Sequence, residues 1–146
     1  MEQSTIVKAS DSDLAWLFPS LGYEEAALRI LEQGPRLVVV TLGEEGAIGL
    51  GAGIRVKVGA PRVEVVDTIG AGDEFGAALL AWLHDHGALR VDLNLNPIEL
   101  GSALAFACQA ASLMCARAGA DPPLRAEVIA LAVASDTVGE SGGSGR

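Results

Sequence analysis

Residues 67–75 read DTIGAGDEF and combine two glycines with a carboxylate. Glycine costs roughly 1 kcal/mol relative to alanine inside a helix, so Gly70 and Gly72 at the start of a helical run indicate a need for bare backbone. A glycine turn that opens a helix directs several successive N–H groups toward one point, where the helix dipole adds partial positive charge. The stretch therefore predicts an anion-binding site that a phosphate can approach closely.

Asp73 directly follows this turn, and two explanations of it are open. A carboxylate in the first turn of a helix interacts favourably with the helix dipole, which would make Asp73 purely structural. Alternatively, Asp73 is a general base that takes a proton from an attacking hydroxyl beside the bound phosphate. The stretch is neither a Walker loop, which requires a Gly-Lys-Ser/Thr ending, nor a G-x-G-x-x-G turn.

The elements around this turn predict an α/β domain. Residues 4–10 are rich in β-branched side chains and predict a strand, and helical patterns follow at 11–18 and 22–34. The unbroken apolar run 37–40 is typical of a strand that is covered on both faces. Residues 47–68 predict two or three short strands, the last of which ends near residue 66 and leads into the glycine turn.

Helices dominate the second half of the chain. Residues 70–86 predict a helix, and residues 97–118, which are apolar nearly all round, predict a deeply buried one. A last short helix follows at 127–133. We expect Trp16 and Trp82 to lie in the core. Residues 1–134 are expected to form one domain, and residues 135–146 are expected to be a disordered tail.

Composition narrows the class of protein. The 146 residues are 50% hydrophobic and 4% aromatic, with a net charge of −9 and no cluster of lysine or arginine. Such a chain is not expected to bind nucleic acid or an anionic membrane. No secretion signal and no apolar run of about 18 residues is evident, so we expect a cytoplasmic protein. Cys108 and Cys115 on one helix would be about 10 Å apart, which is too far for a disulfide.

The stretch 67–75 resembles the second signature of the ribokinase-like, PfkB-type carbohydrate kinases, D-T-x-G-A-G-D-x-F, and matches all of its specified residues. Residues 38–50 resemble the family's nucleotide-side strand and T-x-G-x-x-G turn, although an ordinary strand-exit turn would look similar. Residues 106–120 resemble the late helix that closes over adenine. The pattern K-x-S-x-x-D-L from Lys8 onward is similar to the fructokinase branch, and the matches together span about residues 4–134.

This resemblance implies the C-terminal part of a ribokinase-like three-layer α/β/α fold with a mostly parallel sheet. It implies that Asp73 is the base that deprotonates a sugar hydroxyl, and that its own N–H group helps to form the anion hole. The other N–H groups of the hole would belong to Gly70, Ala71 and Gly72. The residues implied to contact ATP are Thr41, Gly43, Gly46 and Cys108.

The resemblance also implies metal ions, and here the chain departs from the family pattern. Magnesium would be bound mainly by the nucleotide phosphates, helped by an N-x-x-E motif in which Ser10 and Asp13 replace the asparagine and glutamate. Many members hold a monovalent cation, K⁺, where Asp67 and the Gly119 turn fall. Cys108 stands where an asparagine is common, and a thiol cannot replace the donors and acceptors of that amide.

Family members are about twice as long as this chain, which resembles their C-terminal half. The N-terminal half would supply most sugar-binding residues, and lost positioning can cost up to about 7–11 kcal/mol. We therefore expect little or no kinase activity from the chain alone. Expected partners are ATP, a small sugar, and a separate N-terminal half or a second copy. The open alternatives are a kinase for ribose, 2-keto-3-deoxygluconate or a nucleoside, a non-catalytic nucleotide-binding fragment, and a remnant of a truncated gene.

Overall fold

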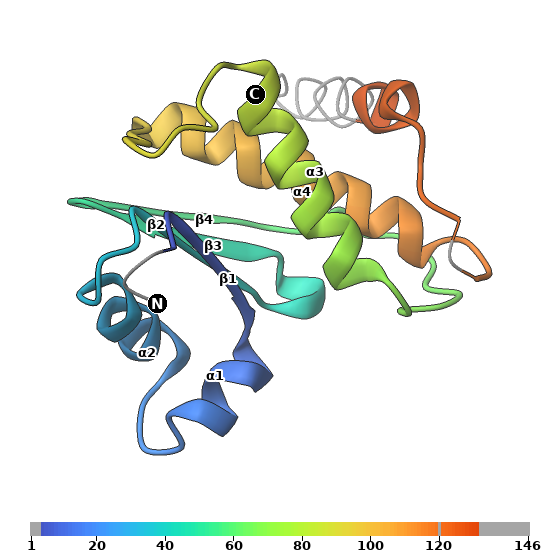
Figure 1. Ribbon diagram of the computed structural model, residues 1–146. Helices are drawn as coiled ribbons and strands as arrows, with labels where there is room; N and C mark the ends of the chain where they lie inside the picture. Colours follow the sequence, from blue (N-terminus) through green and yellow to red (C-terminus); the bar gives the residue numbers. More distant parts are fainter. Residues whose placement is uncertain (1–3, 120, 132–146) are drawn as a thin grey trace, which may run out of the picture.

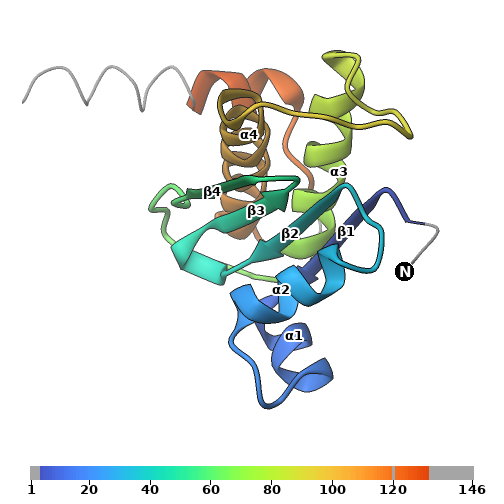
Figure 2. The same cartoon turned by 90° about the vertical axis from the view of Figure 1, so that its left-hand side faces the viewer.

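Two layers of helices enclose a four-stranded sheet in the computed structural model, which describes residues 4–119 and 121–131 (Figures 1 and 2). Helices α1 (Asp11–Leu17) and α2 (Tyr23–Leu31) cover one face of the sheet. Helices α3 (Ala71–Asp85) and α4 (Pro97–Cys115) cover the other. This arrangement confirms the predicted α/β class with three layers. The predicted tail, 135–146, lies outside the described residues.

The sheet is mixed. Its strands lie in the order β1-β2-β3-β4 and have the bounds β1 (Ile6–Ser10), β2 (Leu37–Thr41), β3 (Ala47–Gly51) and β4 (Ile54–Val58). Strands β1 and β2 are parallel, whereas β2–β3 and β3–β4 are antiparallel. The expectation of a mostly parallel sheet is therefore corrected for this part of the fold. A parallel crossover takes a dozen or more residues, and the connections 42–46 and 52–53 are too short for one.

Residues 59–66 form an irregular segment and not the further strand expected there. In the described part of the chain these residues pair with no strand, although the outer edge of β4 is free. They bond to α4 instead: the Val66 N–H donates to the Cys115 carbonyl at 2.8 Å, and the Ser112 hydroxyl donates to the Pro61 carbonyl at 3.4 Å. The segment thus lies against α4 before it reaches the glycine turn.

The sheet divides the apolar interior into two clusters. Successive side chains of a strand point to opposite faces. Accordingly, Leu37 and Val39 pack with α3 and α4, while Val38 and Val40 pack with α1 and α2. Burial on both faces, as predicted for this strand, explains why the sequence of β2 is an unbroken apolar run.

Helix α4 is a buried core helix, as predicted. It packs against α3, β3 and β4, and eight of its side chains are buried. Its length and composition would also suit a membrane span, a test that buried core helices pass as well. Trp16 is 82% exposed, so its expected place in the core is wrong. The short helix α1 buries only Leu14, and Trp16 lies on its outward side.

Candidate functional site

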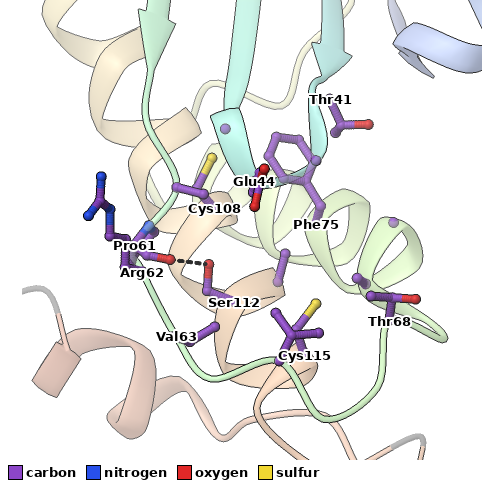
Figure 3. A pocket seen from close by; sticks show the side chains of 17 residues that line it. Thr41, Glu44, Pro61, Arg62, Val63, Thr68, Phe75, Cys108, Ser112 and Cys115 are labelled. Carbon is purple, nitrogen blue, oxygen red and sulfur yellow. Dashed lines mark hydrogen bonds between the residues drawn. The ribbon is translucent and has the colours of Figure 1, made fainter.

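A pocket of about 890 Å³ opens where β2 ends (Figure 3). Ligands of α/β proteins bind outside the carboxyl ends of the strands, and small-molecule sites typically have volumes of about 300–1,000 Å³. Four segments that are distant in the sequence line it: the turn after β2, the irregular segment 60–68, the first turn of α3, and one face of α4. The position and the size of the pocket therefore suit a small ligand.

Thr41, at the end of β2, and Gly43 and Gly46, in the turn that follows, all line the pocket. Their predicted contact with ATP stays a prediction. Gly43 and Gly46 have φ angles of 57° and 99°, which side chains rarely tolerate. A β-carbon on Gly46 would lie 2.0 Å from the carbonyl oxygen of Val58. Gly46 therefore also lets the turn pack against the end of β4, a structural role that holds with or without a ligand.

The start of α3 differs from the starts of α1 and α4. Those two helices begin with capping boxes, in which side chains bond the first N–H groups. Helix α3, like α2, has no side-chain cap and begins at Gly70, whose φ is 81°. Within the described residues the N–H groups of Gly72 and Asp73 donate no hydrogen bond. The first turn of α3 can therefore offer these donors to a ligand.

Two of the four predicted anion-hole residues, Ala71 and Gly72, line the pocket, and the other two border it along the chain. A β-carbon on Gly70 would lie 2.9 Å from the Met114 side chain, and one on Gly72 would lie 3.2 Å from Nζ of Lys8. A larger residue at either position would therefore meet a neighbouring side chain. Lys8, for which no role was predicted, reaches this turn from β1.

Asp73 is exposed in the first turn of α3, one residue beyond Gly72. Its carboxylate makes no hydrogen bond or ion pair within the described part of the chain and is open to solvent. The next residue, Glu74, is half-buried, and burial raises the pKa of its carboxyl. The unpaired carboxylate of Asp73 thus lies beside the pocket and does not line it.

One face of α4 forms a wall of the pocket with Cys108, Ala111, Ser112 and Cys115 (Figure 3). Burial raises the pKa of the Cys108 thiol to about 11. Burial, followed by the nearby Asp67 carboxylate, raises the pKa of Cys115. Both cysteines are free, as their spacing predicted, and both are neutral at pH 7. This wall is therefore uncharged and largely apolar.

The residues predicted to bind metal ions lie on three segments of the chain: the first turn of α1, the loop before α3 and the loop after α4. The Asp13 carboxylate accepts a hydrogen bond of 2.9 Å from the Ser10 N–H, which lowers its pKa and closes the cap of α1. The Asp67 carboxylate accepts one of 2.9 Å from the Ile69 N–H, and Gly119 lies beyond the end of α4 with a φ of 77°. In the described ranges no group of three or more His, Cys, Asp or Glu side chains could hold a metal ion.

Several lining residues were missed by the sequence analysis, chiefly segment 60–65 and three residues of α4, Ala111, Ser112 and Cys115. The α4 residues follow Cys108 at intervals of three and four, so helical spacing from Cys108 could have identified them. Segment 60–65 reaches the pocket only through the tertiary fold, and its sequence carries no such signal. Arg62 lies on the outer side of this segment, with its guanidinium directed away from Thr68 and Phe75 (Figure 3).

Comparisons with known proteins give a consistent result. The model of the family described as "pfkB family carbohydrate kinase" matches residues 1–127. A fructokinase of Solanum tuberosum is 34% identical over 131 residues, which cover 89% of this chain and 40% of that protein. A fructokinase of Rhizobium leguminosarum bv. trifolii is 47% identical over 81 residues, which cover 56% of this chain and 25% of that protein.

A solved structure agrees with these sequence matches. The crystal structure of fructokinase from Vibrio cholerae O395, in its fructose-, ADP- and calcium-bound form, is similar with a TM-score of 0.73 and 30% identity. The likeness covers 86% of this chain and 40% of that one. The chain thus spans less than half the length of these relatives.

Proposed function

Because this chain belongs to the pfkB family of carbohydrate kinases, we propose that it carries the nucleotide-binding side of an ATP-dependent, fructokinase-like enzyme. The reaction would transfer the γ-phosphate of ATP to a hydroxyl of a small sugar. One observation carries the proposal: the N–H groups of Gly72 and Asp73 are free, at the edge of a pocket large enough for a nucleotide. Such donors suit the charge that develops on a transferring phosphoryl group.

The pocket offers a different surface to each part of ATP. The neutral α4 wall around Cys108 suits the flat, largely apolar base, while the free N–H groups at the start of α3 suit phosphates. The glycine turn at Gly43 and Gly46 also lines the pocket and would let part of the nucleotide approach the backbone. The related Vibrio fructokinase binds ADP, which supports a nucleotide as the ligand of this pocket.

Asp73 would act as the general base. Its exposed, unpaired carboxylate can take the proton of a sugar hydroxyl, whose oxygen then bonds to the γ-phosphorus while the bond to the β–γ bridging oxygen breaks. The free N–H groups of the adjacent turn would hold the transferring group in place. We propose that the sugar contacts come from outside the described residues, because the chain covers only 40% of the related fructokinases of Solanum and Vibrio.

Magnesium fits this site as an ion held mainly by the nucleotide. Asp13 has one carboxylate oxygen engaged in the α1 cap, and the described residues form no multidentate group. Asp13 could still contact the magnesium ion through a bridging water molecule. When bound, the ion would neutralise charge on the β- and γ-phosphates. The monovalent-cation site at Asp67 and Gly119 stays a prediction.

A non-catalytic nucleotide-binding module is the second candidate. The exposure of Asp73 and the partial coverage of the relatives favour it for the chain on its own. In either case ATP–magnesium should raise the melting temperature of the chain, because a ligand that binds only the native state stabilises it by RT ln(1 + [L]/Kd). No shift at millimolar ATP–magnesium would contradict both candidates.

Catalysis can be tested by complementation. The chain is mixed with the N-terminal part of the Solanum fructokinase that its match does not cover, and fructose-dependent ADP release is measured. Turnover in the mixture, with none in either part alone, supports the kinase. Asp73→Asn should then lower turnover by about 10²–10⁴-fold while leaving the ATP-induced melting shift intact. Retained turnover in Asp73→Asn would show that Asp73 is not the base.

A further inference from the structure

We propose that Lys8 binds the terminal phosphate of the nucleotide and positions it over the Gly72 turn, an inference that rests on the proposed function. Lys8 lies in the middle of β1. A β-carbon on Gly72 would be 3.2 Å from its Nζ, so the ammonium group occupies the space directly beside that glycine. Gly72 lines the pocket and carries one of the free N–H groups. The exposed ammonium group therefore lies beside a residue that carries one of these donors, although Lys8 itself does not line the pocket.

The charge of Lys8 is not balanced by a salt bridge, which is unusual in this acidic protein. Most described lysines and arginines form ion pairs, for example Arg55 with Glu24 and Lys57 with Glu45. In the described ranges Lys8, Arg36 and Arg62 form none. The charge of Lys8 contributes slightly to the lowered pKa of the Asp13 carboxyl, but that carboxylate bonds the α1 cap and forms no ion pair with Lys8. The exposed Lys8 ammonium group is therefore available to an anionic ligand that binds at the start of α3.

Neither of the other two unpaired cations is placed to share this role. Arg36 precedes β2, at the opposite end of that strand from Thr41 and the pocket. Arg62 borders the pocket, but its guanidinium is directed away from Thr68 (Figure 3). Lys8 is thus the cation that the fold brings to the start of α3.

The position of Lys8 is unfavourable while the site is empty. The start of a helix carries partial positive charge, and a cation next to it is destabilising. Places where a sequence breaks a local rule of this kind are expected at functional sites. A phosphate placed between the ammonium group and the N–H groups turns this repulsion into two attractions, and charge-assisted hydrogen bonds are about twice as strong as neutral ones.

A structural explanation of Lys8 also exists. Strand β1 pairs only with β2 among the described strands, and lysines on edge strands commonly discourage sheet-to-sheet association. That role requires a charge on the strand but gives no reason for an effect on nucleotide affinity. The two explanations therefore differ in what a charge-removing substitution changes.

The experiment measures binding of ATP–magnesium and of AMP to the full chain by titration calorimetry. Lys8→Met keeps the aliphatic length without the charge, Lys8→Arg keeps the charge, and Arg36→Met is the matched control at an unpaired cation away from the pocket. Lys8→Met should weaken ATP–magnesium binding about tenfold, or ~1.4 kcal/mol, and leave AMP binding unchanged. Lys8→Arg and Arg36→Met should stay close to the parent. The melting temperature of ligand-free Lys8→Met should equal or exceed that of the parent.

The possible outcomes separate this proposal from the proposed function. A parent chain that binds neither ATP nor AMP overturns both. A parent that binds ATP, with equal affinity in Lys8→Met, overturns the role of Lys8 and leaves the nucleotide pocket standing. Equal weakening of ATP and AMP, or a lower melting temperature of Lys8→Met together with weaker binding in Lys8→Arg, would show that Lys8 is structural.

Discussion

Gly72→Asp tests the anion hole most directly, because it places a carboxylate where the phosphate should bind. The backbone of Gly72 lies outside the positive-φ region, so a side chain is tolerated there. Its β-carbon would meet only the flexible end of Lys8, at 3.2 Å. The new carboxylate can pair with that ammonium group and occupy the space that a phosphate would need. The substitution should therefore change the charge of the site without disrupting the fold.

The size of the effect follows from Coulomb's law. Two unit charges 4 Å apart interact by about 4 kcal/mol at an effective dielectric constant of 20, which corresponds to roughly a thousandfold loss of affinity for ATP. The free chain should respond in the opposite direction, because an acidic residue in the first turn of a helix is stabilising by about 0.3–1 kcal/mol. Gly72→Asp should thus bind ATP far more weakly and melt at an equal or higher temperature.

Titration calorimetry with ATP–magnesium measures the first quantity, and thermal denaturation of the ligand-free chain measures the second. Ala77→Asp is the matched control, because it adds the same charge at an exposed position of the same helix. Ala77 lies five residues further on, about 7.5 Å along the axis and roughly 140° around it. It should leave ATP affinity almost unchanged. If Gly72→Asp bound ATP within threefold of the parent, the N–H groups at this turn would not be the phosphate site.

Three further predictions address the turn, the thiols and the α1 cap. Gly46→Ala should destabilise the chain by about 3 kcal/mol or more in urea unfolding, because its β-carbon would lie 2.0 Å from a β4 carbonyl oxygen. Gly43→Ala, with open space, should cost only about 1–2 kcal/mol, and equal costs would contradict the packing argument. Cys108, with a pKa of about 11, should react with iodoacetamide at pH 8 far more slowly than in urea. ATP–magnesium should slow labelling of Cys115 as followed by mass spectrometry, and an unchanged rate would place the nucleotide elsewhere. Asp13 has a folded pKa below its ordinary 3.8, so its stabilising effect is present above that value and lost as pH falls through the lower one. Asp13→Asn should therefore make stability less dependent on pH below about 4 in an acid titration by circular dichroism, and an unaltered acid profile would count against the cap bond.

Local patterns predicted most of the helices and strands because each buries one face or both. The β2 run is apolar since both faces are covered, and the start of α1 at Ser10 follows from its capping chemistry. The mixed sheet was not predicted. The expectation of a mostly parallel sheet came from the family resemblance, whereas the short connections between β2, β3 and β4 require antiparallel pairs. Trp16 was misplaced because a seven-residue helix has too few positions to define its buried side.

Only those parts of the candidate site could be predicted that depend on a glycine turn or on residue spacing along one helix. The turns at Gly43, Gly46 and Gly72 are visible in the sequence because glycine marks them: Gly43 and Gly46 have positive φ angles, and Gly72 leaves space beside Lys8 at the start of α3. Lys8 and segment 60–65 were not visible, since they reach the pocket from another strand and from an irregular segment. Their roles depend on the register and packing of the sheet, which no local pattern encodes.

The free side of β1 decides from where a phosphate acceptor can approach. In the described part of the chain β1 has β2 on one side and no strand on the other. A strand added there in parallel would end at the same rim as Ser10, about 4.8 Å further from β2. Its outgoing loop would then lie next to the end of β1, at the opposite edge of the sheet from β4. Under the proposed function, a sugar held by such a loop would approach the pocket from the β1 edge.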